Sequence, residues 1–230
     1  MNVCAIIPAG GQGTRMGGTI PKQFLTLRGK PILHYTLGTL QESGLIDSLV
    51  LVVPEKELES ARADWLERPP VVKQVVVGGE KRQDSVFNGY QALPTDTDIV
   101  LVHDGVRPFL SKGMIHETIH VAGKFGAAIT AIPIHDTLKQ VDVSGLVQRT
   151  VERDGLWRVQ TPQAFRYDLL GEAFRKAQAD SFYGTDEGAL IENLGQEVRV
   201  VNGSEWNLKI TRPEDLEMGE SIVAKLFLEG

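Results

Sequence analysis

The chain has 230 residues, of which 42% are hydrophobic and 23% charged, and its formal net charge is −6. This composition is typical of a globular protein with one hydrophobic core, and it argues against a disordered chain, a coiled coil or a collagen-like repeat. The negative charge disfavours a general nucleic-acid binder, which needs a basic face. We therefore expect no nucleic acid among its partners.

The sequence also argues against a membrane protein and a disulfide-stabilised one. No apolar run approaches the ~18 to 20 residues that cross a bilayer, and the start lacks the charged and apolar regions of a signal peptide. We expect a cytoplasmic protein with no membrane partner. The single cysteine, Cys4, lies within the apolar run Val3 to Ile7, which predicts a small buried hydrophobe.

Apolar runs alternate with stretches of helical length in the first part of the chain. The predicted strands are Val3 to Ile7, Ser48 to Val53, Val71 to Val77, Ile99 to Val102 and Ala127 to Ile134. The predicted helices between them are Pro31 to Thr39, Glu55 to Glu67, Gln83 to Leu93 and Lys112 to Lys124. This alternation predicts an α/β fold, with a parallel sheet between two layers of helices and ligands at the carboxyl ends of the strands.

The pattern changes after Ile134. Residues 135–157 mix polar and apolar side chains without a helical period, which predicts an extended arm or hairpin. The elements predicted beyond the arm are helices at Tyr167 to Gln178, Asp186 to Leu194 and from Pro213, and strands at Val198 to Asn202 and Asn207 to Ile210. No repeat or long linker is present, so we expect one domain over residues 1–230.

The first predicted strand is followed by a glycine-rich, cationic segment. Residues 1–41 contain no Asp or Glu, and residues 8–18 include five glycines. Glycines allow backbone amides to approach phosphate oxygens closely. The dinucleotide-binding fingerprint fails because Met16 stands where glycine is required, and the Lys-Ser/Thr pair of a Walker A loop is absent. The segment therefore indicates a different polyphosphate loop.

The same segment reads G-G-x-G-T-R-M-G and is followed by Pro21-Lys22-Gln23. It resembles the first loop of nucleotidyltransferases that join a sugar phosphate or polyol phosphate to a nucleotide. Arg15 could bind phosphate oxygens through two parallel hydrogen bonds, and Lys22 could place its positive charge near the phosphorus under attack. A structural glycine turn with surface cations is the alternative.

Two further loops follow predicted strands. Asp104 comes after Ile99 to Val102, where a carboxylate is well placed to hold Mg²⁺ beside a triphosphate, although a helix cap or a turn would also use aspartate. Arg107 would face the same anion, and we expect His103 to be a structural hydrogen-bonding residue. Gly78 to Ser85 would let a nucleotide approach, with Ser85 either donating to the base or ribose or capping a helix.

Together with later segments, these motifs resemble the 2-C-methyl-D-erythritol 4-phosphate cytidylyltransferases of the non-mevalonate isoprenoid pathway. The later segments are Asp136 to Lys139, Thr150 to Trp157, Gln160 to Phe165, Thr185 to Glu187 and Asn207 to Asp215. The resemblance implies transfer of CMP from CTP to 2-C-methyl-D-erythritol 4-phosphate with release of pyrophosphate. It also implies a three-layer Rossmann-like nucleotidyltransferase sheet, mostly parallel, with a protruding β-arm.

The resemblance further implies a role for each matched residue. The catalytic residues would be Arg15, Lys22 and Lys209. The nucleotide would be bound by Ala9, Gly10, Gly11, Gly13, Gly79, Glu80 and Ser85. The methylerythritol phosphate would be bound by Asp104, Arg107, Thr137, Arg153, Thr161 and Thr185, with Asp104 also the candidate ligand of Mg²⁺ or another divalent cation. The arm at about 135–157 would cross to a partner subunit, so that Thr137 and Arg153 serve the neighbouring site of a homodimer.

Alternatives remain at this stage. Gly10, Glu80 and Val106 depart from the commonest family pattern, and Val106 to Phe109 is also similar to the pentitol-phosphate cytidylyltransferases, which makes ribitol 5-phosphate the alternative acceptor. Two segments favour methylerythritol phosphate, Arg153 to Trp157 and Asn207 to Asp215. A protein that binds nucleotide without catalysis is a further alternative, which the joint presence of two lysines and an aspartate at the site disfavours.

A zinc-hydrolase motif is also present. Residues 116–120 read H-E-x-x-H, the helical signature in which two histidines bind zinc and the glutamate activates water. The longer signature needs a third histidine where this chain has Gly126, and no downstream helix offers a convincing glutamate ligand. We therefore interpret the motif as a solvated helix face.

Overall fold

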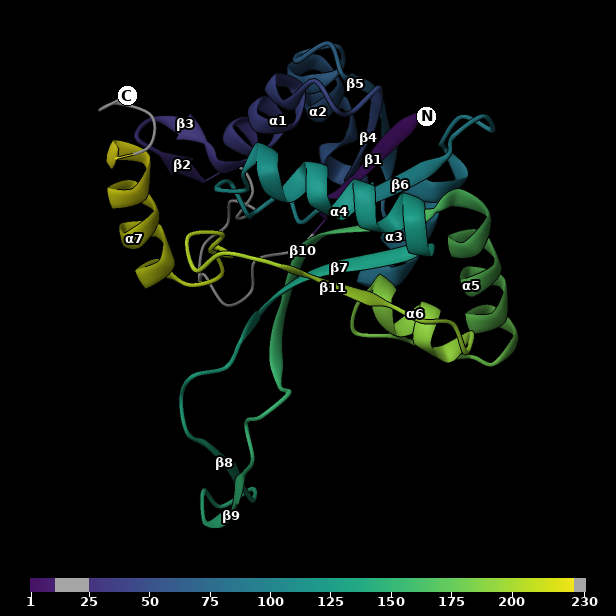
Figure 1. Ribbon diagram of the computed structural model, residues 1–230. Helices are drawn as coiled ribbons and strands as arrows, with labels where there is room; N and C mark the ends of the chain where they lie inside the picture. Colours follow the sequence, from purple (N-terminus) through teal and green to yellow (C-terminus); the bar gives the residue numbers. More distant parts are fainter. Residues whose placement is uncertain (11–24, 226–230) are drawn as a thin grey trace.

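The computed structural model describes residues 1–10 and 25–225, and its centre is a seven-stranded sheet (Figure 1). Across the sheet the strands are β11 (Arg199–Asn202), β7 (Ala127–Pro133), β10 (Trp157–Arg166), β6 (Ile99–Val102), β1 (Val3–Pro8), β4 (Ser48–Val53) and β5 (Val72–Val77). All neighbours are parallel except β10, which is antiparallel to both β6 and β7. The predicted mostly parallel α/β sheet is confirmed.

Helices cover both faces of this sheet. They are α1 (Ile32–Ser43), α2 (Leu58–Trp65), α3 (Arg82–Gln91), α4 (Lys112–Phe125), α5 (Tyr167–Ala179) and α6 (Glu187–Asn193). A further helix, α7 (Pro213–Val223), lies to one side of the sheet and packs in a separate cluster with the start of α1. Successive side chains of β1 point to opposite faces, and both sets are buried. Ala5 and Ile7 pack in a cluster with α1, α2 and α4, whereas Cys4 and Ile6 pack in a cluster with α3, α5 and α6. The three layers are confirmed, as is the burial of Cys4.

The residues after the arm differ from the prediction in two places. The sheet strand β10 was not predicted, because Pro162 and a shift of register between Val159 and Gln163 break its alternation. The predicted strand Asn207 to Ile210 is wrong, because no neighbouring strand pairs with it. Those residues form a loop in which Ile210 N donates to Val106 O, and a third core cluster packs the loop against α1 and α7.

The arm is a hairpin that extends away from the sheet (Figure 1). Its strands, β8 (Leu138–Val141) and β9 (Val147–Val151), pair antiparallel. Asp142 forms the turn, since its Oδ1 accepts from the amides of Ser144 and Leu146, and Gly145 supplies the positive φ of +86°. The hairpin exposes four aliphatic side chains, those of Val141, Val143, Leu146 and Val147. None of the helices in the described part of the chain has the length and apolar character of a membrane span.

Candidate active site

A cavity of about 770 Å³ lies where β1, β5 and β6 end. Parallel strands bring their carboxyl ends to one edge, which is where such sheets bind ligands. Seven of the residues predicted for the site line this cavity, namely Ala9, Gly10, Gly79, Glu80, Ser85, Asp104 and Lys209. The structure therefore brings together residues from three separate loops and from the loop that precedes α7.

The loop between β5 and α3 lines the cavity with two glycines, Gly78 and Gly79, which have no side chains. A Cβ atom on Gly79 would lie 2.3 Å from Cβ of Asp84, so a side chain does not fit there. Ser85 Oγ accepts from the amide of Gly79 at 3.1 Å and lies 3.1 Å from Lys81 O. Asp84 caps the start of α3 by accepting from the amide of Lys81 at 3.0 Å. The cap role belongs to Asp84, and Ser85 fixes the shape of the glycine loop.

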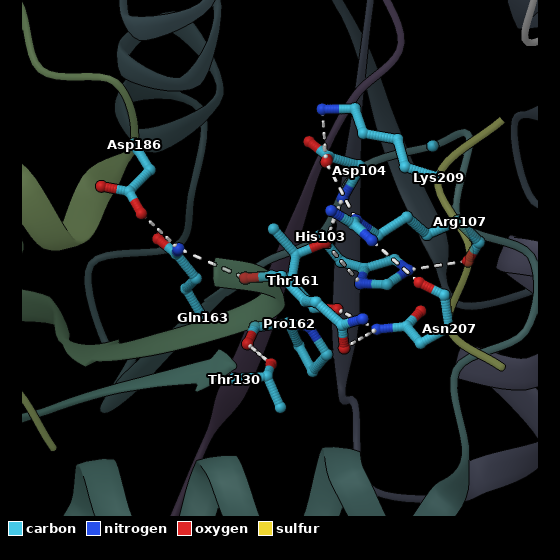
Figure 2. A network of polar contacts seen from close by, with 12 residues as sticks. His103, Asp104, Arg107, Thr130, Thr161, Pro162, Gln163, Asp186, Asn207 and Lys209 are labelled. Atoms are coloured by element: carbon cyan, nitrogen blue, oxygen red, sulfur yellow. Dashed lines mark hydrogen bonds and ion pairs between the residues drawn. The ribbon is translucent and has the colours of Figure 1, made fainter. Parts of the chain in front are cut away.

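Asp104 is held by three cations from three different segments. Its Oδ2 lies 2.8 Å from Nζ of Lys209 and 3.3 Å from Nε of Arg107, and its Oδ1 lies 3.5 Å from Nε of Arg82 (Figure 2 shows the first two). Burial by itself would raise the pKa of the Asp104 carboxyl, but Lys209, Arg82 and Arg107 outweigh that effect and hold its pKa well below the usual range. Asp104 is therefore ionised at neutral pH.

Arg107 joins two loops. Its Nη1 donates to Asn207 O at 2.8 Å, and Asn207 Nδ2 in turn donates to Thr161 O at 2.7 Å (Figure 2). Because Arg107 is mostly buried and does not line the cavity, its visible role is to fix the loop that carries Lys209 against the loop that carries Asp104.

His103 and Thr161 fix the backbone at Asp104 from beneath. Thr161 Oγ1 accepts from the amide of Asp104 at 3.0 Å, so its hydroxyl proton is free to go to His103 Nδ1, also at 3.0 Å. Nε2 then carries the imidazole proton and donates to Arg107 O at 3.0 Å. Burial lowers the pKa of His103 to about 4, which keeps the ring neutral. The expected structural role of His103 agrees with this geometry.

Other predicted residues lie elsewhere. Thr137 and Arg153 are exposed on the arm, and Arg153 donates to the backbone oxygen of His135. Thr185 is exposed just before α6. Four predicted residues, Gly11, Gly13, Arg15 and Lys22, lie outside the residues that the structure describes.

Sequence reasoning missed Arg82 and Glu187. Nη1 of Arg82 lies 2.7 Å and 2.9 Å from the two carboxylate oxygens of Glu187, which is 1% exposed. The pair joins the start of α3 to the start of α6, and nothing in the sequence pattern links two residues so far apart. The one available signal was a glutamate beside a predicted helix start in the matched segment Thr185 to Glu187.

The H-E-x-x-H motif lies on an exposed face of α4. His116 and His120 are both exposed, and their parallel rings are 6.2 Å apart. Among residues 1–10 and 25–225 no group of three or more His, Cys, Asp or Glu side chains is arranged to hold a metal ion. The exposure of both histidines agrees with the interpretation of a solvated helix face.

The fold and this site, a mostly parallel sheet with a glycine-lined, cation-rich cavity at its carboxyl edge, define an α/β nucleotidyltransferase. The family model described as 2-C-methyl-D-erythritol 4-phosphate cytidylyltransferase matches residues 3–225. The chain belongs to this family, whose members catalyse a step of isoprenoid biosynthesis, and it is a cytidylyltransferase.

Individual relatives agree with the family model. The chain is 45% identical over 223 residues to the 2-C-methyl-D-erythritol 4-phosphate cytidylyltransferase of Pelotomaculum thermopropionicum, covering 96% of this chain and 94% of the relative. It is 44% identical to the enzyme of that name from Syntrophus aciditrophicus, covering 97% and 96%. A crystal structure of that enzyme from Francisella tularensis superposes with a TM-score of 0.83 at 31% identity, covering 96% of this chain and 100% of that one.

Proposed function

We propose that the cavity binds CTP and that the phosphate of 2-C-methyl-D-erythritol 4-phosphate attacks its α-phosphorus there. The observation that carries this assignment is the convergence of the Gly78–Gly79 loop, Asp104 and Lys209 around one cavity in a chain of this family. Ala9, Gly10, Gly79, Glu80 and Ser85 would bind the cytidine part of the nucleotide.

The chemistry needs no catalytic base, because the attacking phosphate oxygen is already an anion. One P–O bond forms to the α-phosphorus as the bond to pyrophosphate breaks. Catalysis then rests on alignment and on neutralising the charge that develops around that phosphorus. Lys209 would do so from the cavity wall, and Arg15 and Lys22 would act from the glycine-rich segment, which lies outside the described residues.

Asp104 is the residue that would hold a divalent cation. Mg²⁺ prefers oxygen ligands, and beside nucleotides it is usually held by one or two carboxylates together with phosphate oxygens and water. One carboxylate fits that pattern, and its Oδ1 has the longer ion-pair contact, 3.5 Å to Arg82. A bound Mg²⁺ would supply positive charge to the triphosphate.

Because a single carboxylate makes a weak site by itself, we expect Mg²⁺ to bind together with CTP. Calorimetry should show no Mg²⁺ binding to the protein alone at ~1 mM, but clear CTP binding when Mg²⁺ is added. Excess EDTA should abolish pyrophosphate release, and added Mg²⁺ should restore it. Turnover that persists unchanged in excess EDTA would contradict this assignment.

We further propose that the protein is a cytoplasmic homodimer built through the arm. The support is the position of the predicted phosphate ligands: Thr137 and Arg153 lie exposed on the arm, which extends away from the sheet that carries Asp104 and Lys209 (Figure 1). The exposed aliphatic side chains of the hairpin are those a partner could cover. Thr185, which is exposed, would bind the acceptor within the subunit, and the buried Arg107 and Thr161 would serve its pocket by holding the loop at Asp104 in place.

This dimer predicts that two inactive variants can complement each other. Arg153→Ala removes a phosphate ligand that would act in the partner's site, whereas Lys209→Ala inactivates the site in its own subunit. A hybrid dimer therefore has both defects in one site and an intact second site. After subunit exchange, an equal mixture should recover roughly a quarter of the wild-type turnover. A mixture that stays at the mean of the two parents would refute the shared site.

A further inference from the structure

Glu187 is a buried carboxylate that does not line the cavity. It begins α6 on the α3 side of the sheet, and its two oxygens flank one nitrogen of Arg82 at 2.7 Å and 2.9 Å. A buried charge is tolerated when it is paired, and removing one partner leaves the other charge uncompensated. Arg82 and Glu187 therefore fix each other.

Arg82 spans two carboxylates. Its guanidinium is planar and rigid, so binding Glu187 through Nη1 also orients Nε, which lies 3.5 Å from Asp104 Oδ1. Asp104 Oδ2 in turn lies 2.8 Å from Nζ of Lys209. Alternating charges thus run without a break from Glu187 through Arg82 and Asp104 to Lys209.

Both carboxylates of this chain of ion pairs, Glu187 and Asp104, are anchored on β10. Near Glu187, the Gln163 side chain donates to Asp186 Oδ2 at 2.7 Å and accepts from the amide of Gly188 at 3.3 Å. At the second carboxylate, Thr161 Oγ1 accepts from the amide of Asp104 at 3.0 Å. Figure 2 shows Gln163 and Thr161 on the same strand, between Asp186 and Asp104. One strand therefore sets the separation of the two carboxylates that Arg82 bridges.

We propose that Glu187 is a positioning residue for cytidylyl transfer: it holds Arg82 in the orientation that leaves Asp104 free to keep Lys209 at the cavity. The inference rests on the catalytic role proposed above for Lys209. Without the Glu187 charge, the guanidinium of Arg82 loses the carboxylate at its Nη1 end and turns toward Asp104, the other carboxylate it contacts. Arg82 then competes with Lys209 for the Asp104 oxygens, and the lysine moves away from the reacting phosphate.

A double-mutant cycle tests this route. Glu187→Gln keeps the shape of the side chain and removes its charge, and we expect kcat to fall ~10-fold with the KM for CTP within about twofold of wild type, because small displacements of a catalytic group act on turnover. In the Lys209→Ala background, Glu187→Gln should lower kcat by less than about twofold, because the lysine through which it acts is gone. Glu192→Gln, an exposed glutamate on the same helix, is the matched control and should leave kcat unchanged.

A second variant keeps the test independent of how well Glu187→Gln folds. Arg82→Lys keeps the positive charge, but one ammonium group does not bridge two carboxylates held by different elements, so kcat should fall and the loss should again vanish in the Lys209→Ala background. An equal loss of kcat in both backgrounds, or a rise in KM at unchanged kcat, would overturn the positioning role while leaving the proposed function of the protein standing. Absence of pyrophosphate release from the wild-type enzyme would overturn the proposed function as well.

Discussion

Replacing Lys209 with alanine is expected to lower kcat by ~100-fold or more, because a cation aimed at charge that develops in the transition state contributes roughly 3 to 4 kcal/mol. Its Nζ lies at the cavity wall and is held there by Asp104 at 2.8 Å. Steady-state pyrophosphate release measures the effect. A loss of similar size is expected for Lys22→Ala, on the evidence of the sequence alone.

Two observations separate a catalytic loss from a folding defect. The variant should keep the wild-type circular dichroism spectrum and unfold cooperatively, because Lys209 is partly exposed. Lys176→Ala, which removes a partly exposed lysine of α5, should retain wild-type turnover. Near-normal turnover of Lys209→Ala would refute the role assigned to this lysine.

Replacing Asp104 with asparagine is expected to lower the free energy of unfolding by about 2 to 3 kcal/mol. The substitution removes the anion shared by Lys209, Arg107 and Arg82 and leaves three cations close together. The expected loss lies below that of a fully buried pair because Lys209 and Arg82 are partly exposed to solvent. Urea unfolding without Mg²⁺ or substrates measures it.

The metal-free condition makes this test specific. If Asp104 served only as a metal ligand, removing its charge from a metal-free protein would leave stability unchanged or raise it. Asp180→Asn, which removes an exposed carboxylate paired with Lys176, is the control and should change stability little. An Asp104→Asn variant whose free energy of unfolding equals that of the wild type would therefore contradict the structural role of the carboxylate.

The sheet was predictable from sequence where its strands are buried on both faces. Ser48–Val53 and Ile99–Val102 were predicted with the boundaries that the structure shows. Strands of a parallel sheet are buried on both faces, so each one appears in the sequence as a short, continuous apolar run. β10 escaped prediction because Pro162 and a bulge hide its alternation. The loop at Asn207 to Ile210 resembles a strand locally, but whether a segment pairs depends on neighbours that the sequence does not show.

Some residues of the site were likewise predictable from the sequence, and others were not. Gly79 and Asp104 were predictable because each follows a strand, and the carboxyl ends of parallel strands converge. Glu187 was not, because its pairing with Arg82 depends on how α3 and α6 pack on one face of the sheet. The residues proposed to contact substrate can thus be predicted from motifs and sheet topology. The residues that orient them can be identified only once the packing of the helices is known.

The measurement that tests the central assignment most directly is pyrophosphate release by the purified protein with Mg²⁺ and CTP. The acceptor would be either 2-C-methyl-D-erythritol 4-phosphate or ribitol 5-phosphate, and UTP, GTP and ATP would serve as nucleotide controls. We expect release with CTP and methylerythritol phosphate, and little with any other combination. Release with ribitol 5-phosphate in preference, or none in any mixture from a folded protein, would contradict the account.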